Sequence, residues 1–187
     1  MPTEDQTFNR LSADDLKQHG SEFEHCKFIN CDFQGAYLSN LVFIDCEFQD
    51  CNIALCDFKN TGLQNVVFTH CKLSGVDFSK TRDFLFKVRF ADCLLDNAIF
   101  YRKKNKNGKF INCSCTETDF TDADLTGTLF DNCNLHRAFF GNTILKDADF
   151  TTSYNFTIDP DANMLKKTKF SVHGLPGLLT KYDIVVK

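Results

Sequence analysis

Tryptophan is absent from this 187-residue sequence, and proline and methionine occur only three times and twice. No apolar run approaches the roughly 18 residues that a membrane-spanning helix needs. The first ten residues, MPTEDQTFNR, are polar and acidic and lack the apolar segment of a secretory signal peptide. Neither a glycine-rich phosphate loop nor the paired cysteine spacing of a zinc site is present. These absences predict a soluble, cytoplasmic protein that needs no metal and no cofactor.

Phenylalanine (21 residues) and cysteine (10 residues) are abundant instead. Because a reducing compartment keeps thiols free, we expect the cysteines to be small buried side chains and not disulfides. The formal net charge of −4 is too small to indicate a class of partner by itself.

Six cysteines mark a long repeat. They are spaced by 20 residues, with one interval of 22: Cys31, Cys51, Cys71, Cys93, Cys113 and Cys133. A repeat this long and this regular indicates a structural unit stacked on copies of itself. An apolar residue also recurs every five positions from Phe23 to Phe150, and the residue two positions before it is usually small.

A period of five matches neither a helix nor a strand, and indicates short extended pieces separated by corners. In an extended piece, residues i and i−2 point the same way, so one large and one small side chain face inward. Asn, Asp and Gly suit the corners. Taking every fourth inward residue sorts these residues into four nearly uniform columns. One column is entirely Phe: Phe28, Phe48, Phe68, Phe90, Phe110, Phe130 and Phe150. The sequence therefore predicts an all-β solenoid with four sides and about six 20-residue coils.

Two segments, 122–126 and 147–151, contain Ala-Asp-Leu-Thr and Ala-Asp-Phe-Thr. They resemble the A(D/N)LXX consensus of the pentapeptide-repeat family, and the resemblance extends over about residues 21–156. It implies a right-handed quadrilateral parallel β-helix. It says little about function, because one fold serves many roles.

The predicted solenoid occupies residues 23–156. Residues 1–22 form a leader in which the pattern Ser12 to Asp15 resembles a capping box and predicts a short helix over 13–17. This leader either covers the first coil or is a flexible tail. Residues 157–187 form a C-terminal module, with short helices predicted from Asp159 and around 176–181, and an extended piece at 184–186.

The C-terminal module has too many apolar residues for a free tail: Leu175, Leu178, Leu179, Tyr182, Ile184 and Val186. They are expected to cover the open end of the solenoid, to contact a second copy, or both. The module is similar to the C-terminal segment of quinolone-resistance and microcin-immunity members of the family, where it joins two rods end to end. That resemblance implies a homodimer.

Two segments break the repeat. Two extra residues are inserted at 79–84, and in 101–109 Lys103 and Asn105 occupy positions where core residues belong. Since neither side chain suits an apolar core, we expect 101–109 to bulge out as a loop beside the first irregularity. The region 79–109 holds nine basic and three acidic residues. It is either ordinary charged surface or a contact loop for an acidic partner: Arg82, Lys87, Arg89, Arg102, Lys103, Lys104, Lys106 and Lys109.

The five histidines are scattered, and no nucleophile motif accompanies them. A rod filled with Phe leaves no substrate cavity, so we expect a non-enzymatic protein that binds another protein. Some members of the family imitate duplex DNA and occupy the DNA saddle of DNA gyrase or topoisomerase IV, which protects the enzyme from quinolones or a toxin. The resemblance implies antibiotic resistance of this kind here, through an acidic surface: Asp45, Glu47, Asp57, Asp77, Asp119, Asp122, Asp124 and Asp147.

Two alternatives remain open. The protein is a general interaction scaffold for an unidentified partner, or it binds nucleic acid through the basic region 79–109.

Overall fold

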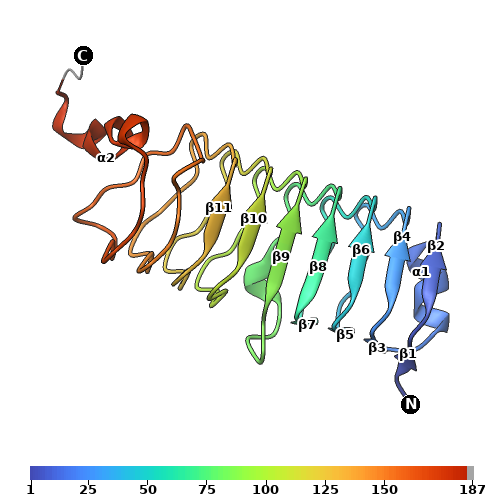
Figure 1. Ribbon diagram of the computed structural model, residues 1–187. Helices are drawn as coiled ribbons and strands as arrows, with labels where there is room; N and C mark the ends of the chain where they lie inside the picture. Colours follow the sequence, from blue (N-terminus) through green and yellow to red (C-terminus); the bar gives the residue numbers. More distant parts are fainter. Residues whose placement is uncertain (185–187) are drawn as a thin grey trace.

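The computed structural model describes residues 1–184. The chain winds into an elongated rod of stacked coils, with α1 at one end and α2 at the other (Figure 1). All the paired strands are parallel, and each lies beside the strand of the next coil. The predicted right-handed, four-sided parallel β-helix is thereby confirmed. No helix within residues 1–184 is long and apolar enough to cross a membrane.

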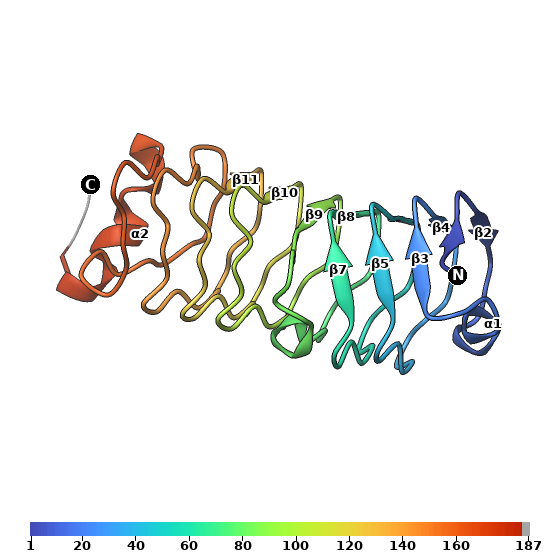
Figure 2. The same cartoon turned by 90° about the horizontal axis from the view of Figure 1, so that it is seen from below.

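Two of the four sides carry continuous sheets. The first sheet, visible in Figure 2, contains β1 (Thr3–Glu4), β3 (Glu22–Glu24), β5 (Val42–Ile44) and β7 (Gly62–Gln64). The second contains β2 (Thr7–Asn9), β4 (Lys27–Ile29), β6 (Glu47–Gln49), β8 (Val66–Thr69), β9 (Val88–Ala91), β10 (Lys109–Ile111) and β11 (Leu129–Asp131). The other two sides are held by single bridges, such as Tyr37 with Asp57 and Asn52 with Lys72.

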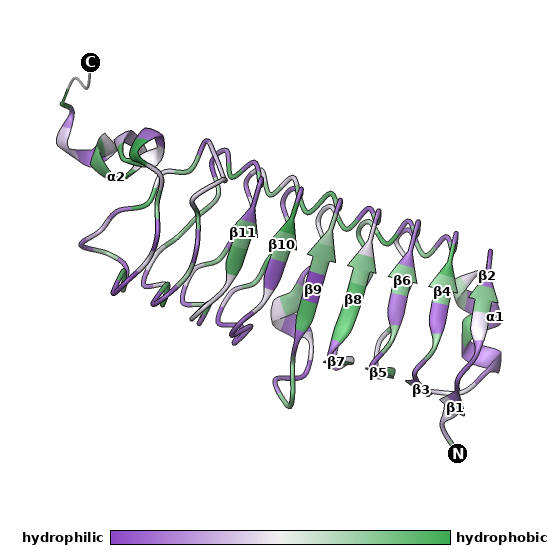
Figure 3. Cartoon of the chain, viewed as in Figure 1, coloured by the Kyte–Doolittle hydropathy of each residue, from purple (hydrophilic) through white to green (hydrophobic). Residues whose placement is uncertain are grey.

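The core is a set of columns in which each side chain lies on its equivalent in the next coil. Phe110 stacks between Phe90 and Phe130, with ring centroids 5.1 and 4.7 Å apart. It also meets Phe120 of the opposite column edge-to-face at 5.8 Å. Both geometries are favoured for aromatic rings. Apolar and polar residues alternate along strands such as β6 and β9 (Figure 3), where only every second side chain faces this core.

The residue two positions after most inward centres has a positive φ, which turns the chain through a corner. Examples are Asn30 (φ 54°), Asn60 (φ 56°) and Gly75 (φ 70°). Asn, Asp and Gly enter this left-handed region at the lowest cost. Their predicted role as corner residues is confirmed.

The small inward residues have a second role. All ten cysteines are free and buried, and the Cys51 thiol donates to the Phe28 carbonyl at 3.3 Å. The hydroxyl of Thr61 donates to the Leu38 carbonyl in the same way, at 2.7 Å. At the inward positions that hold Cys or Thr, a small side chain with one donor fills the space beside the large centre and also satisfies a buried carbonyl.

At the N-terminus, the ladder begins within the leader, because β1 and β2 pair with β3 and β4. The predicted helix is α1 (Ala13–Gln18), and Ser12 and Asp15 form its capping box. Leu16 of this helix is fully buried, so α1 covers the first coil.

At the C-terminus, the helix predicted from Asp159 is wrong. Met164 bridges Ile144 and Lys169 bridges Asp149, so this segment continues the coils. Main-chain pairing with the preceding coil outweighs the local helix-start signal. The later helices are present as η2 (Val172–Gly174), α2 (Pro176–Leu179) and η3 (Thr180–Tyr182).

The stacked columns predict a sharp difference between two phenylalanines. Phe110→Ala removes a fully buried ring with stacking partners on both sides, and should lower the free energy of unfolding by about 3–5 kcal/mol. Phe139→Ala removes a ring that is 57% exposed and should cost about 1 kcal/mol or less. Urea unfolding followed by circular dichroism measures both, and equal losses would contradict the column model.

Candidate functional site

The two-residue insertion makes one loop leave the four-sided path. After η1 (Phe78–Lys80), residues 81–87 project from the rod just before β9 (Figure 1); we call this segment the excursion. Phe84 and Leu85 at its tip are 72% and 62% exposed, whereas Phe86 turns inward and is buried. Counting back five positions from the inward Phe90 predicts that Leu85 is also inward, and this prediction is wrong. The sequence does contain a sign of this difference. Residues 84–86 are three large apolar residues in a row, whereas the repeat has one large inward residue in every five.

The second irregular segment does not bulge. Lys104 bridges Asp124, and Asn107 forms a normal corner with φ 54°, so 101–109 stays in the coil. Lys103 and Asn105 are both 1% exposed. The predicted loop is wrong because both polar side chains find partners inside the rod.

Those partners belong to the excursion and to β9. The Lys103 ammonium donates to the carbonyl of Thr81 at 2.7 Å and to Asp83 Oδ1 at 2.7 Å. The Asn105 side-chain amide donates to the Val88 carbonyl and accepts from the Val88 N–H, both at 3.1 Å. The two irregular segments are thus in direct contact, on adjacent coils, as their spacing indicates.

The eight basic residues predicted to contact a partner fall into three groups. Lys103 is buried. Arg102 and Lys106 are exposed, but they form ion pairs with Asp122 (3.4 Å) and Asp124 (3.0 Å). The remaining five form no ion pair within residues 1–184 and are partly or fully exposed: Arg82, Lys87, Arg89, Lys104 and Lys109.

Several of these unpaired cations lie close to the excursion. Arg89 on β9 and Lys109 on β10 are in register in adjacent strands, and Lys87 lies at the foot of the excursion. The Arg82 and Arg89 side chains donate to Asn60 and Asn65 at 2.9 Å, which leaves their charge unneutralised. We call Arg82, Lys87, Arg89, Lys104 and Lys109 the basic collar.

The eight predicted acidic residues do not gather on one side of the rod. Three of them are corner residues: Asp45, Asp122 and Asp147. The other five lie on three different sides of the rod: Glu47 on one, Asp124 on a second, and Asp57, Asp77 and Asp119 on a third. Five of them form ion pairs: Glu47 with Lys27, Asp77 with Lys80, Asp122 with Arg102, Asp124 with Lys106, and Asp147 with Lys146. His25 lies near Asp45, while Asp57 and Asp119 accept main-chain N–H bonds.

Asp124 shows how the local partners hold these charges. Partial burial acts to raise the pKa of this carboxyl. Hydrogen bonds from Thr126 and Lys106 outweigh burial and lower the pKa below its ordinary value. Much of the acidic charge is therefore matched by neighbours along the rod and does not form a continuous negative stripe.

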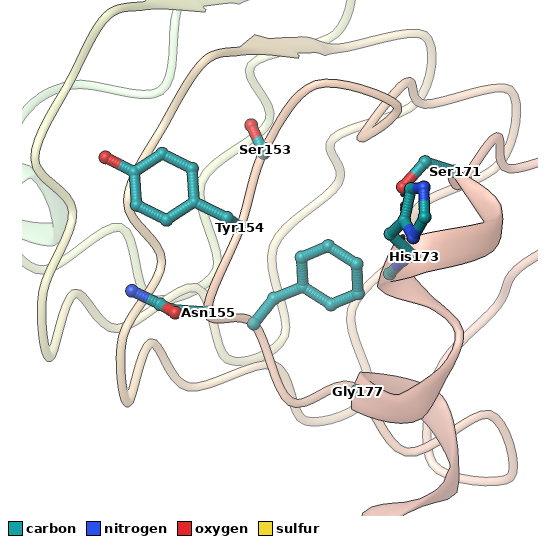
Figure 4. Close-up of a pocket in the computed structure, with 8 residues that line it drawn as sticks. Ser153, Tyr154, Asn155, Ser171, His173 and Gly177 are labelled. Atoms are coloured by element: carbon teal, nitrogen blue, oxygen red, sulfur yellow. Dashed lines mark hydrogen bonds between the residues drawn. The ribbon is translucent and has the colours of Figure 1, made fainter. Parts of the chain in front are cut away.

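A pocket separates the last coil from the C-terminal helices (Figure 4). Ser153, Tyr154 and Asn155 line it from the coil, and Ser171 and His173 line it from the cap. The Ser171 hydroxyl accepts the Gly174 N–H at 3.1 Å, which gives that side chain a helix-capping role.

The α2 helix closes tightly over this end of the rod. A Cβ on Gly177 would lie 2.3 Å from the Phe156 carbonyl oxygen, so only glycine permits this approach. Lys181 forms an ion pair with Asp159 at 2.6 Å and a second one with Asp161, which fastens η3 to the last coil.

The predicted cap residues divide accordingly. Leu178 packs on the core and Leu179 is half-buried. Leu175, Tyr182 and Ile184 remain 44%, 52% and 56% exposed. Val186 lies outside the described residues.

Cys46 and Cys56 are poorly suited to nucleophilic chemistry, because burial raises the pKa of their thiols to about 12. A protonated, buried thiol is a weak nucleophile. Their packing and hydrogen bonding to carbonyls account for them structurally.

Two family descriptions match this sequence. One is a pentapeptide repeat region over residues 21–82, and the other is eight copies of pentapeptide repeats over residues 110–151. Together they cover more than half of the chain, and most of the excursion and all of 101–109 lie between them. A comparison with curated proteins found no match.

Solved structures of QnrB1, a plasmid-mediated fluoroquinolone resistance protein, are similar to this chain. A trypsin-treated form of a QnrB1 variant is 18% identical, covers all of both chains and has a TM-score of 0.63. Full-length QnrB1 is 19% identical, with a TM-score of 0.53 over 98% of this chain and all of the other. At this identity the likeness concerns the fold.

The raised thiol pKa values predict that the protein loses stability at high pH. An unfolded thiol ionises near pH 9.0, whereas the folded Cys46 and Cys56 thiols stay protonated up to about pH 12. Between these values the unfolded state loses protons that the folded state keeps, so the free energy of unfolding falls as pH rises. Urea unfolding at pH 8 and pH 10 measures the change. A Cys46→Ala/Cys56→Ala variant should show a smaller fall, and an identical fall would contradict the assignment.

Proposed function

The chain belongs to the pentapeptide-repeat family, and from that premise we propose that it is a non-enzymatic rod that binds another protein through the excursion. The observation that carries this proposal is the pair Phe84 and Leu85, two large apolar side chains exposed at the tip of a loop. The fold itself has no need of them there, because Phe86 fills the inward position.

The excursion offers a partner two things: apolar surface at its tip and positive charge on the basic collar. Burying an exposed Phe or Leu side chain in a partner contributes about 1.5–3 kcal/mol each. The basic collar, of which Arg82 and Lys87 belong to the excursion itself, would attract a surface with acidic groups and would orient the encounter. The partner that fits is a protein with an apolar pocket rimmed by carboxylates.

A type II topoisomerase, DNA gyrase or topoisomerase IV, is the candidate partner that the family resemblance suggests. QnrB1, which shares the fold, is a fluoroquinolone resistance protein, and protection from quinolones or a toxin is the corresponding role here. Contact through the excursion accounts for such binding better than imitation of DNA, because the eight predicted acidic residues are dispersed over three faces and five of them are in ion pairs. The ten free thiols accord with a cytoplasmic setting.

Two alternatives have distinct consequences. As a general scaffold, the chain would use the excursion on a different protein. As a nucleic-acid binder, it would use the basic collar without Phe84 and Leu85, and its affinity would fall steeply with salt.

A supercoiling assay tests the topoisomerase proposal. Micromolar protein should protect gyrase from a quinolone or inhibit its supercoiling. Phe84→Ser/Leu85→Ser should weaken that effect by at least about tenfold, since two anchors are lost. The matched control is Phe139→Ser, which removes an exposed ring outside the excursion and should leave the effect unchanged.

Two results would contradict the proposal. The first is the absence of any effect of the wild-type protein on gyrase and topoisomerase IV, which would leave the scaffold role. The second is an equal effect of the wild-type and the double variant. A duplex DNA binding assay at two salt concentrations addresses the nucleic-acid alternative directly.

We also propose that the C-terminal module joins two chains. Leu178 and Gly177 already serve the cap, yet Leu175, Tyr182 and Ile184 remain exposed beside it. An apolar cluster that the cap leaves uncovered at the end of a rod is suited to self-association.

Light scattering tests this self-association. The wild-type chain should have twice the mass of the monomer, and Tyr182→Ser/Ile184→Ser should shift it toward the monomer. Tyr37→Ser removes a tyrosine that is 70% exposed elsewhere on the rod, and should leave the mass unchanged. A monomeric wild-type chain would show that the module is only a cap.

A further inference from the structure

Lys103 is an unusual residue for its place in the rod. The equivalent inward position is Thr61 two coils earlier, and Ala123 and Thr143 in the coils that follow. A close-packed interior has room for only a small side chain at this position. Lys103 fits because the excursion draws the chain of the preceding coil away from the regular path.

The Lys103 ammonium is fully engaged by the excursion. Besides the carbonyl of Thr81 and Asp83 Oδ1, it lies 3.5 Å from the carbonyl of Arg82. An ammonium has three N–H donors, so these three oxygens match its capacity. The Phe86 ring covers it, with the nitrogen 4.7 Å from the ring centroid.

This arrangement makes the conformation of the excursion depend on the buried charge. An ammonium that is 1% exposed is strongly destabilising unless its donors are satisfied. Only a conformation that brings the oxygens of residues 81–83 to one point satisfies them. Any displacement of the first half of the excursion therefore leaves a buried charge without partners.

Asn105 holds the other end of the excursion in a similar way. Its side-chain amide forms both hydrogen bonds to the main chain of Val88, where β9 begins. Gly108 makes this possible, because a Cβ there would lie 2.5 Å from the amide nitrogen of Asn105. The excursion is thus fixed at residues 81–83 and at residue 88, and only 84–87 remain between the two points.

We infer that Lys103 and Asn105 are positioning residues that hold the excursion in one conformation and present Phe84 and Leu85 in a fixed orientation. A tip that is already ordered loses less conformational entropy when it binds. The effect on binding rests on the function proposed above, whereas the effect on loop order does not.

The absence of tryptophan provides the test. Phe84→Trp introduces a single reporter at the tip, and its time-resolved fluorescence anisotropy reports local motion. In this background, Lys103→Met should increase the amplitude of the local motion of Trp. The control Lys72→Met changes an exposed lysine on another side and should leave it unchanged.

Limited chymotrypsin digestion gives a second measurement. Lys103→Met should raise the rate of cleavage after position 84 by about tenfold or more, the factor that about 1.4 kcal/mol of lost local stability would produce. Cleavage after Tyr182, in the C-terminal module, is the internal reference and should not change. Asp83→Asn removes the negative charge that faces the Lys103 ammonium but keeps a side-chain oxygen that can accept its hydrogen bond, and the side chain itself is exposed, so this variant should give a smaller increase confined to position 84.

The outcomes are distinguishable. Equal anisotropy and cleavage for Lys103→Met and Lys72→Met would overturn the inference. A second combination of results would also overturn the inference. In it, Lys103→Met accelerates cleavage after both position 84 and Tyr182, which indicates general destabilisation, and Asp83→Asn leaves cleavage after position 84 unchanged. A third outcome separates the two proposals. If Lys103→Met loosens the tip, but Phe84→Ser/Leu85→Ser affects gyrase and topoisomerase IV to the same extent as the wild-type protein, the positioning role stands and the proposed function fails.

Discussion

The stacking of each side chain on its equivalent 20 residues later is the constraint on which the rest of this structure depends. A parallel coil repeats its backbone geometry at every turn, so a residue can be inward only if its neighbours above and below are compatible with it. The Phe column through Phe90, Phe110 and Phe130 satisfies this rule with rings 4.7 and 5.1 Å apart. Small donors such as Cys51 and Thr61 satisfy it beside the rings while they engage buried carbonyls. Left-handed corner residues keep the coil length constant.

That constraint explains why one insertion has consequences on the next coil. Two extra residues remove a segment from the regular path, and the space inside is filled by Lys103 and Asn105 of the following coil. In a regular coil, these side chains would be unpaired polar groups. Here they bond to Thr81, Asp83 and Val88, so the irregularity and its support form one unit. The result is a loop with a defined conformation that exposes two apolar side chains.

The charges of the rod are arranged around the same unit. Eleven of the 25 acidic side chains form an ion pair with a Lys or Arg within residues 1–184, as Glu47 does with Lys27 and Asp124 with Lys106. The basic collar has no such partners. Since exposed ion pairs contribute little to stability, the pairing matters mainly for what the surface presents. The rod presents unneutralised positive charge on and near the excursion together with an apolar tip, and this combination is what the proposed protein contact requires.

The coil length, the number of sides, the inward columns and the corner residues can all be predicted from the sequence. Each of these depends on spacing and residue type along the chain, and the six cysteines from Cys31 to Cys133 record it directly. The sequence also located both irregular segments and the capping box of α1. It did not show that Leu85 is exposed, that Lys103 and Asn105 are buried, or that the residues after Asp159 continue the coils. These features depend on contacts between adjacent coils, and a polar side chain suits the interior only if another coil brings its partners to it. Only the tertiary structure therefore decided which irregularity leaves the rod and which one supports it.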